Sequence, residues 1–171
     1  MIKWLGVLLA ATGIAGTVLA APPQVAVFRF ELIDTSGGGQ KPGHTEWLDG
    51  VTQIIRDGFV QYGFSTPDLT PAQAEIEDGE PLYGCNGCFL DIAKQHQWDW
   101  AVAGVVRKVS ELILGMQVMV FEAETERVLF NRTVSFRGDN WKAWERAAKW
   151  LVRHKLKKLK LFALHHGKFC S

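Results

Sequence analysis

Two repeating patterns of apolar side chains divide the first third of the chain into elements. Residues 25–32 (VAVFRFEL) are apolar apart from two charged positions, which is typical of a buried strand in a covered sheet. Residues 45–62 carry apolar side chains three and four positions apart and predict an amphipathic helix that Gly63 ends. Residues 34–39 (DTSGGG) predict a flexible loop before this helix, and residues 64–66 a short strand after it.

The middle of the chain predicts two short helices. Thr70 stands at an N-cap position, Pro71 at the first helical position, and Gln73 where a capping box closes. Residues 79–81 break this helix with a glycine and a proline. A second short helix is expected from Cys88 to about residue 97.

From residue 98 onward the apolar period changes to that of strands. Alternating or continuous apolar runs with polar turns between them predict three strands, at 99–109, 112–122 and 127–136. At least the last two are expected to form an antiparallel hairpin. A long helix from Trp141 to Phe162 follows, with Asp139 and Asn140 as candidate caps.

The predicted order is β-α-β-α-β-β-β-α, without internal repeats or linkers. It favours an α/β fold in three layers, with a mixed β-sheet of about five strands flanked by about three to four helices. A hydrophobic fraction of 47% and only 6 prolines exclude a disordered or collagen-like chain. We expect one domain at residues 21–165, and a flexible tail at 166–171.

Residues 1–20 predict a secretory signal peptide. Lys3 supplies the positive charge, residues 4–18 the apolar stretch, and residues 18–20 (VLA) the cleavage pattern. A transmembrane anchor is the alternative, but glycines dilute a stretch that is already short for a span of about 20 residues. We therefore expect cleavage after Ala20 and a periplasmic location.

The charges of the chain are unevenly distributed. The formal net charge is +1, and removal of Lys3 with the signal peptide neutralises it. Residues 31–99 hold 12 acidic and 3 basic side chains, whereas residues 142–168 hold 9 basic and 1 acidic side chain. A neutral chain without a recognition motif does not suit nucleic acid. We expect the two charge blocks to pair largely within the fold.

Several segments carry a resemblance to a known family. VAVFRFELIDTS, the start of the predicted helix at Cys85-x-x-Cys88, WAVAGVVRKVSELIL, VMVFEAETERVLFNRTVSFRGDN and the tryptophan-rich last helix resemble an uncharacterised family of secreted bacterial proteins. More distantly, the first strand and the hairpin are similar to the N-terminal domain of the translocation protein TolB and to the curli-secretion lipoproteins. These relatives imply a three-layer α/β fold that works by protein contacts. The close family implies no activity and no functional residue.

Cys85 and Cys88 form the sharpest local chemical feature. Two thiols this close are expected to oxidise in an exported protein. A loop so small contributes only about 2 kcal/mol by chain entropy. The pair is therefore interpreted as a disulfide that shapes the turn before the helix; a redox-active pair and a metal site remain open alternatives. Cys170 is left over near the end of the chain.

The remaining candidates for chemistry are weak. Ser36 and Gly37 to Gly39 follow the first strand, where doubly wound sheets bind ligands, but they match no phosphate-binding pattern and favour a mobile loop. His44, His96 and His154 are scattered outside any hydrolase or zinc motif. Trp98 and Trp100 are expected on one face of a strand, in core or rim packing. We predict no catalytic residue, no resident metal and no cofactor.

The last helix is the best candidate for an interaction surface. Its apolar positions from Trp141 to Phe162 form one stripe. Beside the stripe runs a row of basic residues, here named the basic ridge: Lys142, Arg146, Lys149, Arg153, Lys157 and Lys160. Like charges three and four positions apart repel one another, so an acidic protein, an anionic membrane surface or acidic segments of the same chain are the expected counterparts. A simply solvated helix face is the alternative.

Two hypotheses of function follow. The first is an exported, non-enzymatic binding or adaptor module of the cell envelope, which contacts a periplasmic or envelope protein through the basic ridge and the loops after the first strand. The second is a thiol-disulfide or redox-accessory protein that uses Cys85 and Cys88.

Overall fold

The computed structural model describes residues 21–159. The expected signal peptide, Lys160, Phe162, Cys170 and the tail at 166–171 lie outside the described residues.

Five strands form one mixed sheet. They are β1 (Val25–Val27), β2 (Glu31–Asp34), β3 (Trp100–Lys108), β4 (Ile113–Glu122) and β5 (Val128–Arg137). The strands β1 and β2 pair in succession with the same edge of β3, both in parallel. The strands β3, β4 and β5 are antiparallel neighbours. The predicted mixed sheet is confirmed, with β1/β2 at one edge and β5 at the other.

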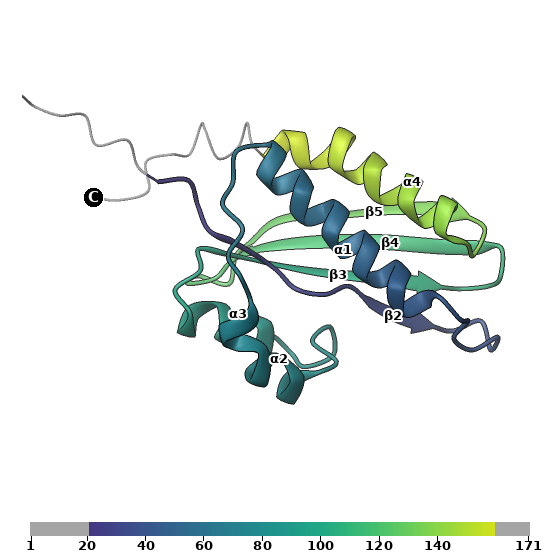
Figure 1. Ribbon diagram of the computed structural model, residues 1–171, viewed down its shortest axis with the longest axis horizontal. Coiled ribbons are helices and arrows are strands. Elements are labelled where there is room, and N and C mark those ends of the chain that lie inside the picture. The colour runs from purple at the N-terminus through teal and green to yellow at the C-terminus, as the bar shows by residue number, and fades with distance from the viewer. Residues whose placement is uncertain (1–20, 160–171) are drawn as a thin grey trace, which may run out of the picture.

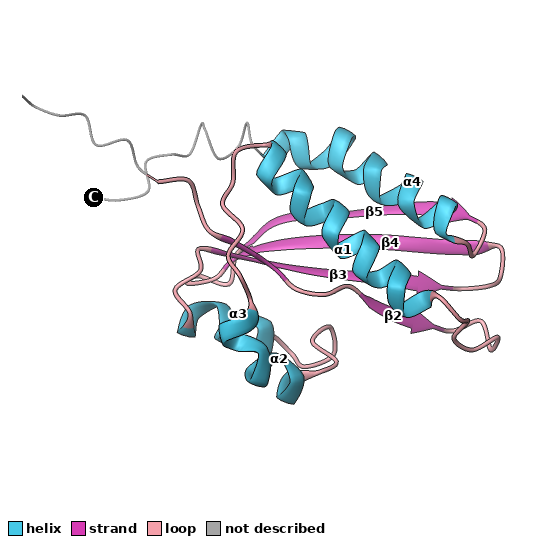
Figure 2. Cartoon of the chain, viewed as in Figure 1, coloured by secondary structure: helices cyan, strands magenta, loops and turns pink. Residues whose placement is uncertain are grey.

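Helices cover the two faces of the sheet in separate layers (Figures 1 and 2). One face carries α1 (His44–Gln61) and α4 (Trp141–Leu151), which lie side by side and contact each other. The other face carries α2 (Gln73–Gly79) and α3 (Cys88–Gln95). The three-layer α/β architecture expected from the sequence is therefore confirmed.

The first predicted strand divides into β1 and β2 at an irregularity in the pairing: Val27 pairs with Val102 and Glu31 with Val105, so three residues oppose two of β3. The backbone N–H of Phe30 donates to Thr52 Oγ1 (2.9 Å), and Arg56 donates to the carbonyl of Val27 (3.3 Å). These bonds satisfy backbone groups that an edge strand otherwise leaves open. Between the two strands, the N–H of Phe28 still donates to Val102 of β3 (3.1 Å), whereas that of Phe30 turns to α1.

The short strand expected at residues 64–66 is absent from the described sheet. Only Ser65 makes an isolated parallel bridge, to Gln24. Pro67 follows closely and has no N–H to continue a ladder. The observed order therefore lacks the strand predicted at residues 64–66. It contains one additional strand because the first predicted strand divides into β1 and β2.

The expected N-cap at Thr70 is wrong. A single turn of 3-10 helix spans Thr70–Ala72 before α2 and has no side-chain cap of its own. Instead, the carboxylate of Asp68 accepts from the backbone N–H (3.0 Å) and the hydroxyl (2.8 Å) of Thr70. Gln73 donates to Glu77 and closes no capping box. By contrast, Asn140 caps α4 as expected, because its Oδ1 accepts from the N–H of Ala143 (3.1 Å).

The alternation of side chains along the strands produces two apolar clusters, one on each face of the sheet. The larger lies under α1 and α4, which approach each other closely at two glycines of α1. A Cβ atom on Gly50 would lie 2.5 Å from the ring of Trp141, and one on Gly58 would lie 2.8 Å from the methyl groups of Val152. This close approach fixes α4 against the sheet.

Trp98 and Trp100 are buried as predicted, but they lie on opposite faces of the sheet. Trp98 packs edge to face with Phe28 in the cluster under α3, whereas Trp100 packs with Phe64 in the cluster under α1. The expected shared face is wrong because β3 begins only at Trp100. The preceding Gln97 has a positive φ of 57°, which turns the chain before the strand starts.

Candidate functional site

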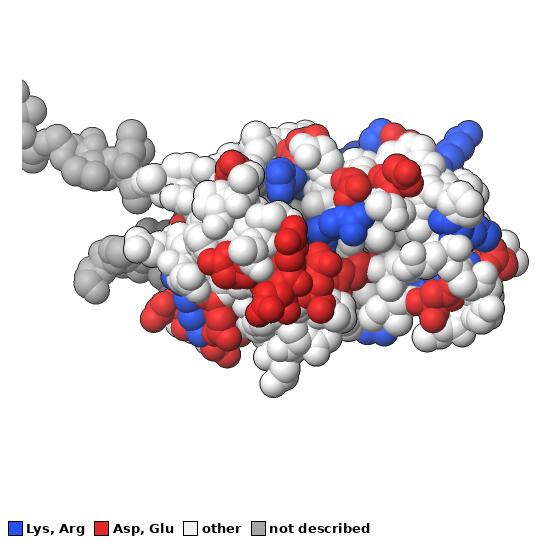
Figure 3. Space-filling view, turned by 60° about the horizontal axis from the view of Figure 1, so that its bottom comes forward, with Lys and Arg blue, Asp and Glu red and all other residues white. Residues whose placement is uncertain are grey.

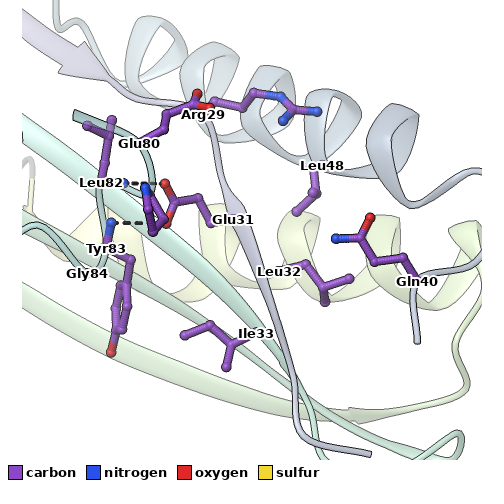
Figure 4. A pocket seen from close by; sticks show the side chains of 11 residues that line it. Arg29, Glu31, Leu32, Ile33, Gln40, Leu48, Glu80, Leu82, Tyr83 and Gly84 are labelled. Atoms are coloured by element: carbon purple, nitrogen blue, oxygen red, sulfur yellow. Dashed lines mark hydrogen bonds between the residues drawn. The ribbon is translucent and has the colours of Figure 1, made fainter. Parts of the chain in front are cut away.

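A groove runs along the edge of the sheet between the two helical layers (Figure 4). Its volume is about 570 Å³. Apolar side chains of β2, α1 and the segment after α2 line it, and polar groups lie at its ends. The lining residues are Arg29, Glu31, Leu32, Ile33, Gln40, Leu48, Glu80, Pro81, Leu82, Tyr83 and Gly84. A smaller groove of about 290 Å³ shares Arg29 and Glu80 with it. Together they follow the free edge of β1 and β2.

One wall of the groove is fastened to the sheet by Glu31. Its carboxylate accepts from the backbone N–H groups of Leu82 (2.5 Å) and Tyr83 (3.0 Å), as the dashed lines in Figure 4 mark. The ring of Tyr83 lies under the guanidinium of Arg107, 5.0 Å from the ring centroid. The wall is thus tied to both β2 and β3.

The disulfide lies at the far end of this wall. Cys85 and Cys88 are joined, with sulfurs 1.94 Å apart and Cα atoms 5.6 Å apart. Cys88 begins α3, and its N–H points at the sulfur of Cys85 (3.1 Å). The expected helix start is confirmed. The pairing closes the turn between the groove wall and α3, and both cysteines are half-buried.

A buried lysine lies at the opposite end of the sheet edge. Lys108, the last residue of β3, has no exposed side-chain surface. Its Nζ lies 2.6 Å from Glu111, 3.3 Å from Asp139 and 3.6 Å from Asp34. It also donates to the carbonyl of Gly39 (3.1 Å). A buried charge is costly unless it is paired and hydrogen-bonded, and here three carboxylates and a carbonyl surround it.

Asp139 connects this lysine to the start of α1. Its side chain, 1% exposed, accepts from His44 Nε2 (3.0 Å) and from the indole N–H of Trp144 (3.2 Å). Nδ1 of His44 accepts the backbone N–H of Lys41 (3.0 Å), so Nε2 carries the hydrogen that Asp139 receives. The imidazole is stacked on Trp144 and packed edge to face on Trp47.

In this cluster the pKa values of the acidic side chains Asp139 and Glu111 are lowered and the pKa of Lys108 is raised. Burial raises the pKa of Asp139, but hydrogen bonds from His44 and Lys41 outweigh it and hold that pKa below the usual value. Hydrogen bonds from Lys108 and Lys41 lower the pKa of Glu111. The hydrogen bond to Glu111 raises the pKa of Lys108 against the effect of burial. The carboxylates of Asp139 and Glu111 and the ammonium group of Lys108 are therefore charged around neutral pH.

The cluster fastens the glycine-rich loop that the sequence favoured as mobile. Ser36 donates through its N–H and its hydroxyl to Asp34, and the ammonium group of Lys108 donates to the carbonyl of Gly39. A Cβ atom on Gly38 would lie 2.5 Å from Glu111, so the loop packs directly on the ion pairs. These contacts join loop 35–43 to the β3–β4 turn.

Reasoning from the sequence missed this cluster. The signal was present at Lys108, because alternation from Trp100 places it on the face that α1 and α4 cover. A charge at the end of such a row predicts buried counter-ions. Asp139 was considered only as a cap, and His44 only as a scattered histidine.

The other histidines have ordinary surroundings. His96 is stacked on Trp98 and lies 3.6 Å from Glu75. His154 is stacked on Trp150 and contacts its carbonyl. Within residues 21–159, no group of three or more His, Cys, Asp or Glu side chains has the geometry of a metal site. No helix in that range combines the length and apolarity needed to cross a membrane.

The basic ridge is exposed along α4 and beyond it. A π-helical turn, Val152–Leu156, continues α4 and keeps both of its end residues buried. The ridge residues of the described chain are all exposed: Lys142, Arg146, Lys149, Arg153 and Lys157. Among them, Lys149 pairs with Glu145 of the same helix (2.6 Å).

The expected internal pairing of the two charge blocks is wrong for the described residues. No ion pair within residues 21–159 joins an acidic residue of the block at 31–99 to the basic ridge. The helices explain why, since α4 covers one face of the sheet while α2 and α3 lie on the other. Figure 3 shows acidic side chains gathered on the α2–α3 side, where Glu77, Asp78, Glu80 and Asp91 are exposed.

The family profile described as "Protein of unknown function (DUF2380)", designated DUF3280, matches residues 23–156. The chain belongs to the DUF3280 family. This match confirms the resemblance to an uncharacterised family and spans the sheet and both helical layers. No curated protein sequence matches this DUF3280 chain.

Solved structures share the fold of this DUF3280 chain at low sequence identity. The hypothetical protein CT253 from Chlamydia trachomatis is 11% identical, with a TM-score of 0.54 over 82% of this chain and 96% of that chain. The lipoprotein GNA1162 from Neisseria meningitidis is 8% identical, with a TM-score of 0.50 over 88% of this chain and 100% of that chain. TolB from Acinetobacter baumannii is 10% identical, with a TM-score of 0.43 over 85% of this chain and 29% of that chain. Likeness at this level concerns the fold alone.

Proposed function

We propose that this protein is an exported, non-enzymatic binding module of the bacterial cell envelope, which holds an acidic surface of a partner protein against its basic ridge. The observation that carries this proposal is the unpaired state of the ridge within the described chain. Lys142, Arg146, Arg153 and Lys157 are exposed without an ion-pair partner there, while the acidic block lies across the sheet.

The energetics favour a protein counterpart for the ridge. Neighbouring cations at three- and four-residue spacing repel by a few tenths of a kcal/mol per pair, and an acidic partner removes this repulsion on binding. Complementary charge also speeds encounter and selects partners. The helix itself is held rigidly by α1, so the row of cations is preorganised before binding.

The proposed export rests on the sequence of residues 1–20 and is supported by the lipoprotein among the structures that share the fold. Its direct check is the N-terminal sequence of the protein purified from cells. We expect that sequence to begin at Ala21, in the periplasmic fraction.

Photocrosslinking in living cells tests the ridge. A crosslinking amino acid placed at Arg146 or Arg153 is expected to capture one discrete partner. The same residue placed at Glu77 or Asp78, which are equally exposed on the acidic side, provides the matched control. Equal capture from both sides of the molecule, or none from the ridge, contradicts the proposal.

A further inference from the structure

The turn between β3 and β4 carries an exposed apolar cluster that the basic ridge does not explain. Val109 is 58% exposed, Leu112 57% and Ile113 50%. The other large apolar side chains exposed to this degree among residues 21–159 are Val60 and Val128, each far from the turn in the fold. We name the segment 109–113 the apolar tip.

Most of the backbone N–H groups of the apolar tip are hydrogen-bonded within the protein. The N–H groups of Val109 and Ser110 donate to the carbonyl of Ile113. The hydroxyl oxygen of Ser110 accepts from Leu112 and Ile113, and the carbonyl of Leu112 accepts from Gly138. These bonds lower the cost of taking the tip out of water, because a backbone group that is already paired loses less hydration.

The single acid of the tip, Glu111, is paired with lysines, although its side chain is 53% exposed. Glu111 pairs with Lys108 (2.6 Å) and with Lys41, and both lysines lower its pKa. Its charge is therefore matched, and the buried cluster holds the turn in shape. The tip presents apolar side chains on a rigid support.

Basic side chains flank the tip. Arg137 stands opposite Ile113 in the register of β4 and β5, and Arg107 stands opposite Gly115. Lys142 lies in the first turn of α4, which begins beside the β3–β4 turn (Figure 1). All three are exposed. Apolar residues at a convex turn with cations around them match the interface of an anionic membrane, where acyl chains meet negative headgroups.

We infer that the apolar tip inserts into the interface of an anionic lipid bilayer, with Arg107, Arg137 and Lys142 at the headgroups. This site shares Lys142 with the basic ridge, but its apolar side chains lie outside the ridge, and the inference does not depend on the proposed protein contact. The tip lies at the end of the molecule where α4 begins, so the ridge extends away from the membrane.

Vesicle flotation tests this inference with the chain from Ala21 onward, which contains both helical layers and the sheet. We use vesicles of phosphatidylcholine alone and with 30% phosphatidylglycerol, a composition chosen to present roughly physiological negative charge. The protein is expected to float with the anionic vesicles. Leu112→Asp is expected to reduce binding roughly tenfold or more, since it removes a large apolar side chain from the interface. Arg137→Gln is expected to weaken binding to the anionic vesicles specifically.

Val128→Asp is the matched control. Val128 is 54% exposed at the opposite end of the sheet, and its substitution adds the same charge. It is expected to leave binding unchanged, and thermal melts of both variants check folding. Equal losses in Leu112→Asp and Val128→Asp overturn the inference, as does the absence of binding to anionic vesicles. A dimer that Leu112→Asp dissociates, without vesicle binding, assigns the tip to self-association and also overturns it.

Discussion

Lys108 Nζ and Asp139 Oδ2 lie 3.3 Å apart in side chains that are 0% and 1% exposed. Lys108 ends β3, whereas Asp139 precedes α4, so this pair joins the sheet to the helix that carries the basic ridge. Around it, His44 and Lys41 add the start of α1 and the loop before it. The pair thereby holds together three segments that are distant in the sequence.

Removing one member of this pair should destabilise the fold strongly. Asp139→Asn removes the most deeply buried counter-ion of Lys108 and Lys41, and breaking a buried pair typically costs about 3–5 kcal/mol. Glu111 and Asp34 remain beside Lys108, so we expect a loss near the lower end of this range. The neighbouring substitution Asn140→Ala removes only the cap of α4 and should cost about 1 kcal/mol. Urea unfolding of the two variants measures the difference. Equal losses would mean that Asp139 acts only as part of the helix start.

The same cluster predicts how stability depends on pH. Asp34, Glu111 and Asp139 have pKa values below their ordinary values of 3.8, 4.5 and 3.8. Below about pH 4.5 the unfolded chain therefore binds more protons than the folded one, and stability falls as the pH is lowered further. Lys41 and Lys108 have pKa values above 10.5, so their contribution is complete below that pH and is lost as the pH rises past the folded values.

Unfolding free energies measured from pH 2 to 7 check the acid side. The difference between wild type and Asp139→Asn should shrink as the pH falls below 4, because the wild-type carboxylate becomes protonated. Asp91→Asn, at a side chain that is 81% exposed, is the control and should show a small, flat difference. A pH-independent gap for Asp139→Asn would be inconsistent with an ionised cluster.

The disulfide should act on the groove wall. Cys85→Ser with Cys88→Ser should cost about 2 kcal/mol by chain entropy and raise hydrogen exchange at residues 80–87, while exchange in β4 stays slow. Retention of the biological role in this double variant favours a structural bond. Loss of that role with unchanged stability and exchange would favour the redox hypothesis instead.

The contact of α1 with α4 predicts an unusual glycine substitution. In a helix, Gly58→Ala should gain about 1 kcal/mol, but its Cβ would lie 2.8 Å from the stiff methyl groups of Val152. Overpacking of this kind costs about 1–3 kcal/mol, so we expect no gain or a net loss. Adding Val152→Ala should restore part of the stability expected from Gly58→Ala, and a double-mutant cycle measures this coupling. Additive effects would show that the helices can separate at this point.

Most of the fold could be predicted from the sequence, because burial of one face gives the apolar residues of a strand or helix a regular spacing. The runs at 99–109, 112–122 and 127–136 became β3, β4 and β5 with ends shifted by at most one residue, since each alternates or stays apolar over its whole length. The start of α3 at Cys88 followed from the bend before it. Asn140 was recognised as a cap because its effect is local.

Features that depend on distant contacts escaped sequence analysis. Thr70 does not cap the helix, because its N–H and its hydroxyl donate to Asp68, a contact that spacing alone cannot predict. Trp98 and Trp100 lie on opposite faces because the chain turns at Gln97 and β3 begins only at Trp100. The buried cluster of Lys108 joins segments that only the fold brings together. The charge blocks stay apart because the layers separate them, and composition contains no information on layers.

Charge reversal on the ridge tests the central proposal most directly. A partner captured by crosslinking at Arg146 or Arg153 is purified, and its affinity is measured for the ridge variant Lys149→Glu/Arg153→Glu/Lys157→Glu. The control variant is Arg127→Glu/Arg132→Glu. Its residues are exposed on β5 and the turn before it. We predict that the ridge variant loses affinity by roughly a hundredfold, as reversal replaces attraction with like-charge repulsion, while the control binds almost as wild type. Equal affinity for wild type and the ridge variant would contradict the proposal that the basic ridge is the binding surface.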